Sequence, residues 1–249
     1  MPTISLVTAV LAGLDEHIGE TYESLLAQEL PAGWEWEWVV QEDGETGDVA
    51  QRLPSDDPRV SFGTGRHGRA AAARTLAMAR VTGKYVRALD ADDRLTLGAL
   101  ARDIEILETQ PVGWVCSPAI DVFPDGTEKA GPRDPRAGLL PRTTMYDGEK
   151  AGLLPVLGTT VTAYADLVRA LGAWQALTLS EDVALMIALE AAAPGWMLDE
   201  PSLWYRKWPS QTTADKTHDA TPWGPGRDVV LGRADALRAL GWSWNPSAH

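Results

Sequence analysis

The sequence predicts an α/β protein built on a mostly parallel, Rossmann-like central sheet with flanking helices. Two observations lead to this fold class. Short apolar runs rich in β-branched residues alternate with segments of helical periodicity through residues 4–108. Polar clusters follow the ends of these runs, where ligands bind in open parallel sheets. The chain has 249 residues, enough to bury a core as one domain.

Four strands and three helices are expected in the first part of the chain. Apolar runs too short for helices predict strands at Ile4–Leu11, Trp34–Val40, Val60–Phe62 and Tyr85–Leu89. Helical spacing or high alanine content predicts helices at Ile18–Leu26, Ala70–Arg80 and Thr96–Glu108. The strand ends would carry Thr8-Ala9, Glu42-Asp43, the Gly63–Gly68 loop and Asp90–Asp93. In a parallel sheet these polar groups meet at one edge.

The second part of the chain is less regular. Its pattern predicts strands at Trp114–Val122 and Val156–Tyr164, and helices at Ala165–Leu171, Glu181–Ala193 and Asp228–Leu240. The Pro-, Gly- and Arg-rich stretch Pro124–Pro141 has turn signals but no periodicity. Residues 196–205 lead into Arg206-Lys207-Trp208, and residues 215–226 are expected to form a loop.

Charge and composition exclude several classes of protein. The 35 Asp and Glu residues outnumber the 22 Lys and Arg residues, and the net charge of −13 disfavours nucleic-acid and anionic-membrane partners. A single cysteine, Cys116, excludes internal disulfides and multi-cysteine zinc sites. No apolar run reaches the roughly 18 residues of a membrane span, and the first residues lack the features of a signal peptide. We therefore expect a soluble, cytoplasmic protein.

An acidic turn, Asp90-Ala91-Asp92-Asp93, directly follows a predicted buried strand. Its three carboxylates repel one another, and an oxygen-preferring cation would neutralise them. Mg²⁺ and Mn²⁺ are typically held by one or two carboxylates together with substrate phosphates. The alternative is that Asp93 only begins the next helix while the other two side chains are solvated.

The segment Gly63-Thr-Gly65-Arg-His-Gly68 matches G-x-G-x-x-G between a predicted strand and a predicted helix. This context fits a dinucleotide fingerprint, although it is not the first βα turn of the sheet. The flanking cations Arg66, Arg69 and Arg74 suit an anion held by side chains. The alternative is a flexible glycine turn.

Ser180-Glu181-Asp182 opens a predicted helix. Helix capping is the simplest explanation, because carboxylates stabilise a helix N-terminus. Two adjacent carboxylates also raise the pKa of one of them toward the range that suits a general base. Trp196, Trp204 and Trp208 suit either stacking on a sugar or base or packing in the core.

In this order the motifs resemble those of family-2 glycosyltransferases, which have the GT-A fold. The resemblance spans about residues 3–213 and rests on six segments: Ile4–Ala9, Tyr22–Gln28, Val39–Gly44, Gly83–Asp93, Glu181-Asp182 and Pro201–Arg206. It implies one glycosyltransferase domain over residues 1–249. Within it, about 1–110 would bind the nucleotide sugar, about 111–213 would bind the acceptor, and 214–249 would form a C-terminal loop and helix.

The resemblance also implies a reaction: transfer of a sugar, with inversion, from a nucleoside-diphosphate sugar to an acceptor hydroxyl or amine. Asp182 would be the catalytic base, and Asp92 would bind the divalent cation, Mn²⁺ or Mg²⁺, that bridges the donor diphosphate. The residues implied in nucleotide-sugar binding are Thr8, Ala9, Asp43, Arg69, Asp90 and Ala91. We expect a UDP-sugar donor, a small-molecule or glycan-precursor acceptor, and a hexosyltransferase type of activity.

Three residues depart from the family pattern. Glu42 replaces the first Asp of an Asp-Asp-Gly turn, Thr75 replaces Asn, and Trp208 stands where several relatives place a His that assists the metal site. His218 could substitute for that His, although a loop residue at the surface is the simpler interpretation. Glu181, Arg206, Lys207 and Trp208 are therefore candidates for acceptor or diphosphate contacts.

Two other functions compete with a transferase. An NAD(P)-binding oxidoreductase is suggested only by the glycine pattern at Gly63–Gly68, and the sequence offers no hydride or proton-relay site for it. A non-catalytic sugar-nucleotide-binding protein is favoured if the three departures have emptied the metal site.

Overall fold

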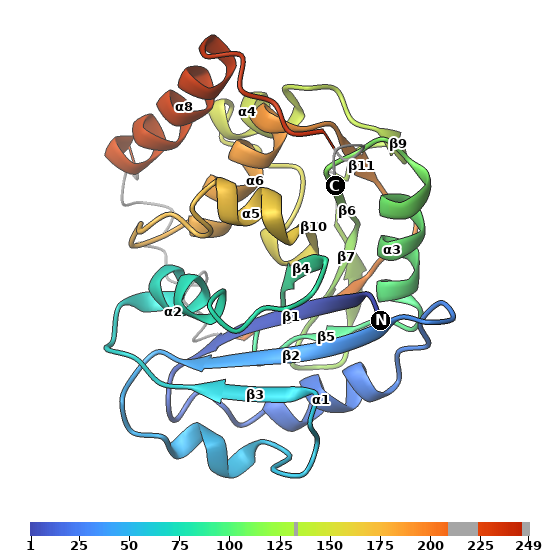
Figure 1. Cartoon of the computed structure of the whole chain (residues 1–249), viewed down its shortest axis with the longest axis vertical. Coiled ribbons are helices and arrows are strands. Elements are labelled where there is room, and N and C mark those ends of the chain that lie inside the picture. The colour runs from blue at the N-terminus through green and yellow to red at the C-terminus, as the bar shows by residue number, and fades with distance from the viewer. Residues whose placement is uncertain (132–133, 209–223, 246–249) are drawn as a thin grey trace.

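The computed structural model describes residues 1–131, 134–208 and 224–245, which form two β-sheets with surrounding helices (Figure 1). The strands of the larger sheet are β1 Thr3–Val10, β2 Glu35–Glu42, β3 Val60–Gly63, β4 Tyr85–Ala88, β6 Trp114–Cys116, β9 Gly138–Leu139, β10 Thr162–Tyr164 and β11 Gly195–Met197. Their order is β3-β2-β1-β4-β10-β6-β11-β9. The smaller sheet contains β5 Arg94–Leu95, β7 Ala119–Val122, β8 Glu128–Ala130 and β12 Leu203–Arg206. Its order is β5-β12-β7-β8.

Strands β1 to β4 are parallel, so their carboxyl ends lie at one edge of the larger sheet. β1 is central to this group and pairs with β2 from Thr3↔Glu35 to Val10↔Glu42. Residues 4–8 of β1 are all buried, as expected for a parallel strand covered on both faces. The predicted strands and their common edge are thus confirmed. Beyond β4 the sheet becomes mixed, because β10 pairs antiparallel with both β4 and β6.

Seven α-helices and two short 3₁₀ turns are described. They are α1 Ile18–Leu26, α2 Arg69–Ala77, α3 Ala99–Thr109, α4 Thr144–Lys150, α5 Ala165–Ala170, α6 Glu181–Ala192, α8 Gly224–Ala239, η1 Asp48–Arg52 and η2 Gly158–Thr160. α2 packs on β1 and β2, while α6 packs between other helices, with α8 beside it (Figure 1). α6 is apolar on all sides and buried from Val183 onward, so only its first turn is available to a site. No helix in the described part of the chain is long and apolar enough to span a membrane.

The structure corrects two strand predictions in the second half. The single strand predicted at Trp114–Val122 is two strands, β6 and β7, which belong to different sheets. They separate at Pro118, whose ring nitrogen has no hydrogen for a ladder bond. The strand predicted at Val156–Tyr164 begins instead with η2 and becomes extended only in β10.

Several elements lacked any sequence signal. β8 and β9 are short and lie within the stretch that showed no periodicity, and the short helix α4 follows that stretch, where no element was predicted. Most of the loop predicted at residues 215–226, including His218, lies outside the described residues. Where the description resumes, α8 begins at Gly224, four residues earlier than predicted.

A buried carboxylate fixes the turn before β3. Asp57 accepts hydrogen bonds from Arg59 Nη2 and from the Tyr22 hydroxyl, both at 2.7 Å. The hydrogen bonds from Arg59, helped by the one from Tyr22, outweigh the effect of burial and hold the pKa of Asp57 well below its usual range. A depressed pKa stabilises the folded chain above the unfolded pKa of about 3.9, and this contribution is lost as the pH falls toward the folded pKa.

We therefore expect Asp57→Asn to lower the free energy of unfolding at pH 7 by about 1–2 kcal/mol, because charged hydrogen bonds are lost. The difference from wild type should shrink below about pH 4, where the unfolded wild-type chain takes up a proton that folded Asp57 resists. Urea unfolding of both proteins between pH 7 and about pH 3 measures this. A difference that does not change with pH would show that the Asp57 charge makes no contribution.

Candidate active site

The carboxylates of Asp90, Asp92 and Asp93 form a compact cluster just beyond the carboxyl end of β4. One oxygen from each lies within 4.8 Å of the others. Asp93 is fully buried, whereas Asp90 and Asp92 are partly exposed. Burial, reinforced by the charge of Asp90, raises the pKa of Asp92 and raises the pKa of Asp93 well above its usual range. A nearby positive charge would stabilise the ionised form of both groups.

Protein donors satisfy only part of this cluster. The Arg206 backbone N–H donates to Asp93 Oδ1 at 2.9 Å, and the Trp208 indole N–H donates to Asp92 Oδ2 at 3.0 Å. The other Asp93 oxygen, Oδ2, is buried and has no hydrogen-bond partner among the described residues. Carboxylate oxygens are the ligands that Mg²⁺ and Mn²⁺ prefer. The cluster therefore fits a divalent cation.

The end of β12 crosses the acidic turn. Arg206 Nε donates to the Asp92 carbonyl at 2.9 Å, and its Nη2 lies 2.6 Å from Glu20 of α1. The Trp208 ring packs against His17, with 4.4 Å between ring centroids. Because an indole N–H only donates, Trp208 orients Asp92 and cannot replace a His as a metal ligand.

Lys207 has different surroundings from its neighbours. Its Nζ forms an ion pair with Asp121 of β7 at 3.3 Å and lies 4.2 Å from the centre of the Tyr205 ring. Adjacent residues of an extended segment point to opposite sides. The structure thus brings Arg206 and Trp208 to the acidic turn and places the Lys207 side chain against the smaller sheet.

Arg74 joins the acidic turn to the start of α6. Its guanidinium donates to Asp90 Oδ1 at 2.5 Å and to Glu181 Oε1 at 2.6 Å, and only 5% of its side chain is exposed. Burial opposes the charge on Arg74, but the carboxylates of Asp90 and Glu181 outweigh it and raise its pKa. A position beside the glycine loop predicts a ligand anion for Arg74, whereas the structure gives it two carboxylates of the protein.

Glu181 and Asp182 begin α6 and have different partners. Burial raises the pKa of Glu181 despite its ion pair with Arg74. Asp182 is part-exposed, accepts the Val183 N–H at 2.8 Å, and packs against Gly158 of η2. A Cβ at position 158 would overlap with the Asp182 side chain, so only glycine allows this approach.

The predicted nucleotide-binding residues of β1 differ in exposure. The Thr8 side chain is fully buried: its hydroxyl donates to the Leu89 carbonyl at 2.7 Å and accepts from Trp38 Nε1 at 2.8 Å. Thr8 therefore links β1 to β2 and to the carboxyl end of β4, and Ala9 is the partly exposed member of the pair. Ala91 is also nearly buried, and its carbonyl accepts a hydrogen bond from Thr21 at 2.9 Å.

Asp43 and the glycine loop are bonded to each other. Asp43 Oδ1 accepts the Gly68 N–H at 2.7 Å, and Oδ2 lies 3.0 Å from His67 Nδ1. The Gly65 N–H donates to the Gly44 carbonyl at 2.9 Å. Arg69 is exposed at the start of α2 and reaches the Thr178 carbonyl at 3.4 Å. Two N–H groups of the loop are thus used within the protein.

Glu42, the departure in the predicted Asp-Asp-Gly turn, stabilises its own turn. Its Oε1 accepts hydrogen bonds from the Thr46 backbone N–H at 2.8 Å and from the Thr46 hydroxyl at 2.9 Å. The side chain is fully buried, so in this structure Glu42 makes internal contacts within the turn.

A family model described as glycosyl transferase family 2 matches residues 11–165, more than half of the chain. The chain belongs to glycosyl transferase family 2. The match begins directly after β1 and contains β2 to β4 and the acidic turn, so it includes most of this edge of the sheet. No curated protein sequence matches the chain significantly.

Solved structures of S. aureus TarS have a similar fold. TarS 1–349 with UDP-GlcNAc superposes with a TM-score of 0.68 at 16% identity, covering 86% of this chain and 61% of that chain. The complex with UDP gives 0.66 at 16% identity, covering 84% and 61%. A longer TarS structure gives 0.67 at 15% identity, covering 98% and 44%. This family-2 chain thus has the GT-A fold and spans about 60% of TarS 1–349.

Proposed function

We propose that this chain is a cation-dependent, inverting glycosyltransferase of the hexosyltransferase type, which moves a sugar from a nucleoside-diphosphate sugar to an acceptor hydroxyl or amine. The observation that carries the proposal is the arrangement around Arg74. This one guanidinium holds Asp90 of the acidic turn at 2.5 Å and Glu181, the neighbour of Asp182, at 2.6 Å. The acidic turn and the start of α6, which carries Asp182, are thereby joined through one side chain.

The two carboxylate groups suit two different tasks. A bound Mg²⁺ or Mn²⁺ would neutralise charge on the departing nucleoside diphosphate. Asp92, with Asp90 and Asp93 beside it, would hold that cation, and Trp208 would fix the orientation of Asp92. Asp182 would accept the proton of the acceptor as it attacks, because a hydroxyl is a poor nucleophile until a positioned base removes its proton.

The donor we propose is a UDP-sugar. TarS, which shares the fold, has been crystallised with UDP and with UDP-GlcNAc. In this chain Ala9, Asp43 and Arg69 would contact the nucleotide, and Asp90 and Ala91 the ribose or donor sugar. The acceptor would be a small molecule or a glycan precursor, approaching from the side of residues 111–213.

The glycine loop gives little support to an NAD(P) oxidoreductase. A dinucleotide site needs free loop N–H groups for the pyrophosphate. Here the Gly65 N–H is bonded to Gly44 and the Gly68 N–H to Asp43. The loop instead braces the end of β2.

The test is a screen of nucleotide sugars for slow donor hydrolysis, which needs no acceptor, with Mn²⁺ present or removed by a chelator. We expect hydrolysis of one or more UDP-sugars only with the cation, and thermal stabilisation by UDP with Mn²⁺ but not by NAD(P). Binding without any hydrolysis would favour a non-catalytic sugar-nucleotide-binding protein. Stabilisation by NAD(P) alone would contradict the proposal.

A further inference from the structure

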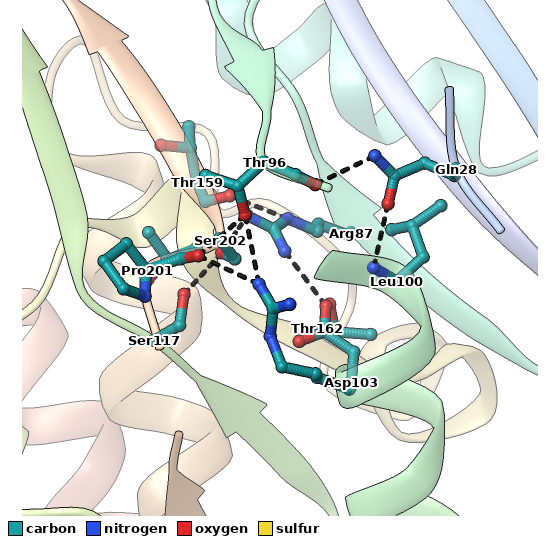
Figure 2. Close-up of polar contacts among 12 residues, drawn as sticks. Gln28, Arg87, Thr96, Leu100, Asp103, Ser117, Thr159, Thr162, Pro201 and Ser202 are labelled. Atoms are coloured by element: carbon teal, nitrogen blue, oxygen red, sulfur yellow. Dashed lines mark hydrogen bonds and ion pairs between the residues drawn. The ribbon is translucent and has the colours of Figure 1, made fainter. Parts of the chain in front are cut away.

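A buried arginine lies in β4, three residues before the acidic turn. Arg87 is 1% exposed and sits between the two sheets, beside α3 (Figure 2). A charged side chain is very rarely buried this completely unless it is paired. The sequence predicts that Arg87 lies in a strand and predicts no functional role for it.

The Arg87 guanidinium binds three separate parts of the chain. Nη1 donates to Asp103 Oδ2 of α3 at 2.9 Å, and Nε donates to the Thr159 carbonyl of η2 at 3.1 Å. Nη2 donates to the Ser202 hydroxyl at 2.7 Å, immediately before β12. Asp103 Oδ2 also accepts a hydrogen bond from Thr162 of β10 at 2.6 Å (Figure 2).

Two of these partners lead directly to the site. Thr159 follows Gly158, which packs against Asp182. Ser202 precedes β12, whose last residue, Arg206, donates its N–H to Asp93. Arg87 itself belongs to the strand that ends at the acidic turn. The Arg87 guanidinium therefore links β4, which leads into the acidic turn, to η2 beside Asp182 and to the start of β12.

The energetics argue against a purely stabilising role. Burial lowers the pKa of Arg87 and raises the pKa of Asp103, which means that the removal of each charge from water costs free energy. Asp103 Oδ1 has no hydrogen-bond partner among the described residues. Apolar residues of similar volume often stabilise a fold as well as a buried ion pair does. Apolar residues cannot, however, form the three directional hydrogen bonds by which Arg87 holds three segments of the chain.

We infer that Arg87 and Asp103 are a positioning pair, which sets the placement of Asp182 relative to the acidic turn and so controls turnover more than donor binding. The inference rests on the proposed function for its kinetic part only. Its structural part, that η2 and the end of β12 are held in place through Arg87, can be measured without any substrate.

The test uses two variants and one control. The double variant Arg87→Met with Asp103→Leu removes both charges, so that neither is left buried and unpaired. Arg87→Lys keeps the charge opposite Asp103 but has one nitrogen for three acceptors, and serves if the double variant folds poorly. Tyr164→Phe is the matched control, because it removes a buried bond to Leu107 at the other end of the same β4–β10 pair.

Under folding conditions we expect hydrogen exchange to quicken by about tenfold or more in residues 158–161 and at the Arg206 amide in both variants, but not in the control. For donor hydrolysis we expect kcat to fall by about 10–100-fold with KM nearly unchanged, because small misplacements of reacting groups slow the chemical step. The inference would be overturned if both variants kept the wild-type rate of hydrogen exchange at residues 158–161 and at the Arg206 amide. It would also be overturned if kcat in these variants fell no further than in Tyr164→Phe. Absence of hydrolysis by the wild-type protein would count against the proposed function, and the exchange data would still decide the role of Arg87.

Discussion

Asp182→Asn is expected to reduce donor hydrolysis by about 10²–10⁴-fold while UDP binding in the presence of Mn²⁺ is unchanged. Asn keeps the length and shape of the side chain but lacks the basic oxygen. The part-exposed Asp182 side chain packs against Gly158 and forms no ion pair with a described residue, so its loss should not disturb the fold.

Glu181→Gln is the matched comparison, because the two acids are adjacent and begin the same helix. Consecutive helical residues diverge by about 100°, and Glu181 is bound to Arg74. We expect Glu181→Gln to lower stability, with a smaller loss of turnover. If Glu181→Gln proved more damaging to kcat and Asp182→Asn remained nearly active, the base would be Glu181 and the assignment would be wrong.

Arg74→Met is expected to lower the free energy of unfolding by about 2–4 kcal/mol. Its removal leaves Asp90 and Glu181 without their shared cation at 2.5 and 2.6 Å. The loss should stay below that of a fully buried pair because the Asp90 side chain is 33% exposed and water compensates part of the charge. Mn²⁺ should restore part of the stability by replacing the positive charge beside Asp90. Urea unfolding with and without Mn²⁺ measures both effects.

Arg52→Met is a suitable control for this measurement. Arg52 pairs with Asp15 at 3.0 Å, but 56% of the Arg52 side chain is exposed, so the expected loss is below about 1 kcal/mol. Similar small losses in both variants would mean that Arg74 behaves as a surface residue. Its part in holding the two halves of the site together would then be refuted.

The edge of the sheet where the site lies was predictable because its signals are local. Short apolar runs specify β1 to β4, and the long crossover connections between them, which contain α1, η1 and α2, allow the strands to be parallel. This places Ala9, Asp43 and Asp90 at one edge. Glu181 and Asp182 were recognisable as the polar start of an otherwise apolar helix. The roles of these residues toward a ligand stay predictions, as does the division of the chain into donor and acceptor halves.

The connections between these parts were not predictable, because they depend on tertiary contacts with no spacing rule. Arg74 meets Glu181 across 107 positions, and Arg87 meets Ser202 across 115. In the sequence, Arg74 is only a cation in an alanine-rich segment, and Arg87 is only a cation in an apolar one. Trp208 reads equally well as a core residue or a stacking platform, and only the structure shows its N–H on Asp92.

In the proposed function the acidic turn binds a divalent cation, which would hold the donor diphosphate. Calorimetric titration of UDP with and without Mn²⁺, on wild type and on Asp92→Asn, tests it most directly. We predict that Mn²⁺ tightens UDP binding to wild type by at least about tenfold, or about 1.4 kcal/mol, and that the variant keeps its fold but loses this dependence. Equal UDP affinity and equal metal dependence in the two proteins would remove Asp92 from the cation site and contradict the account.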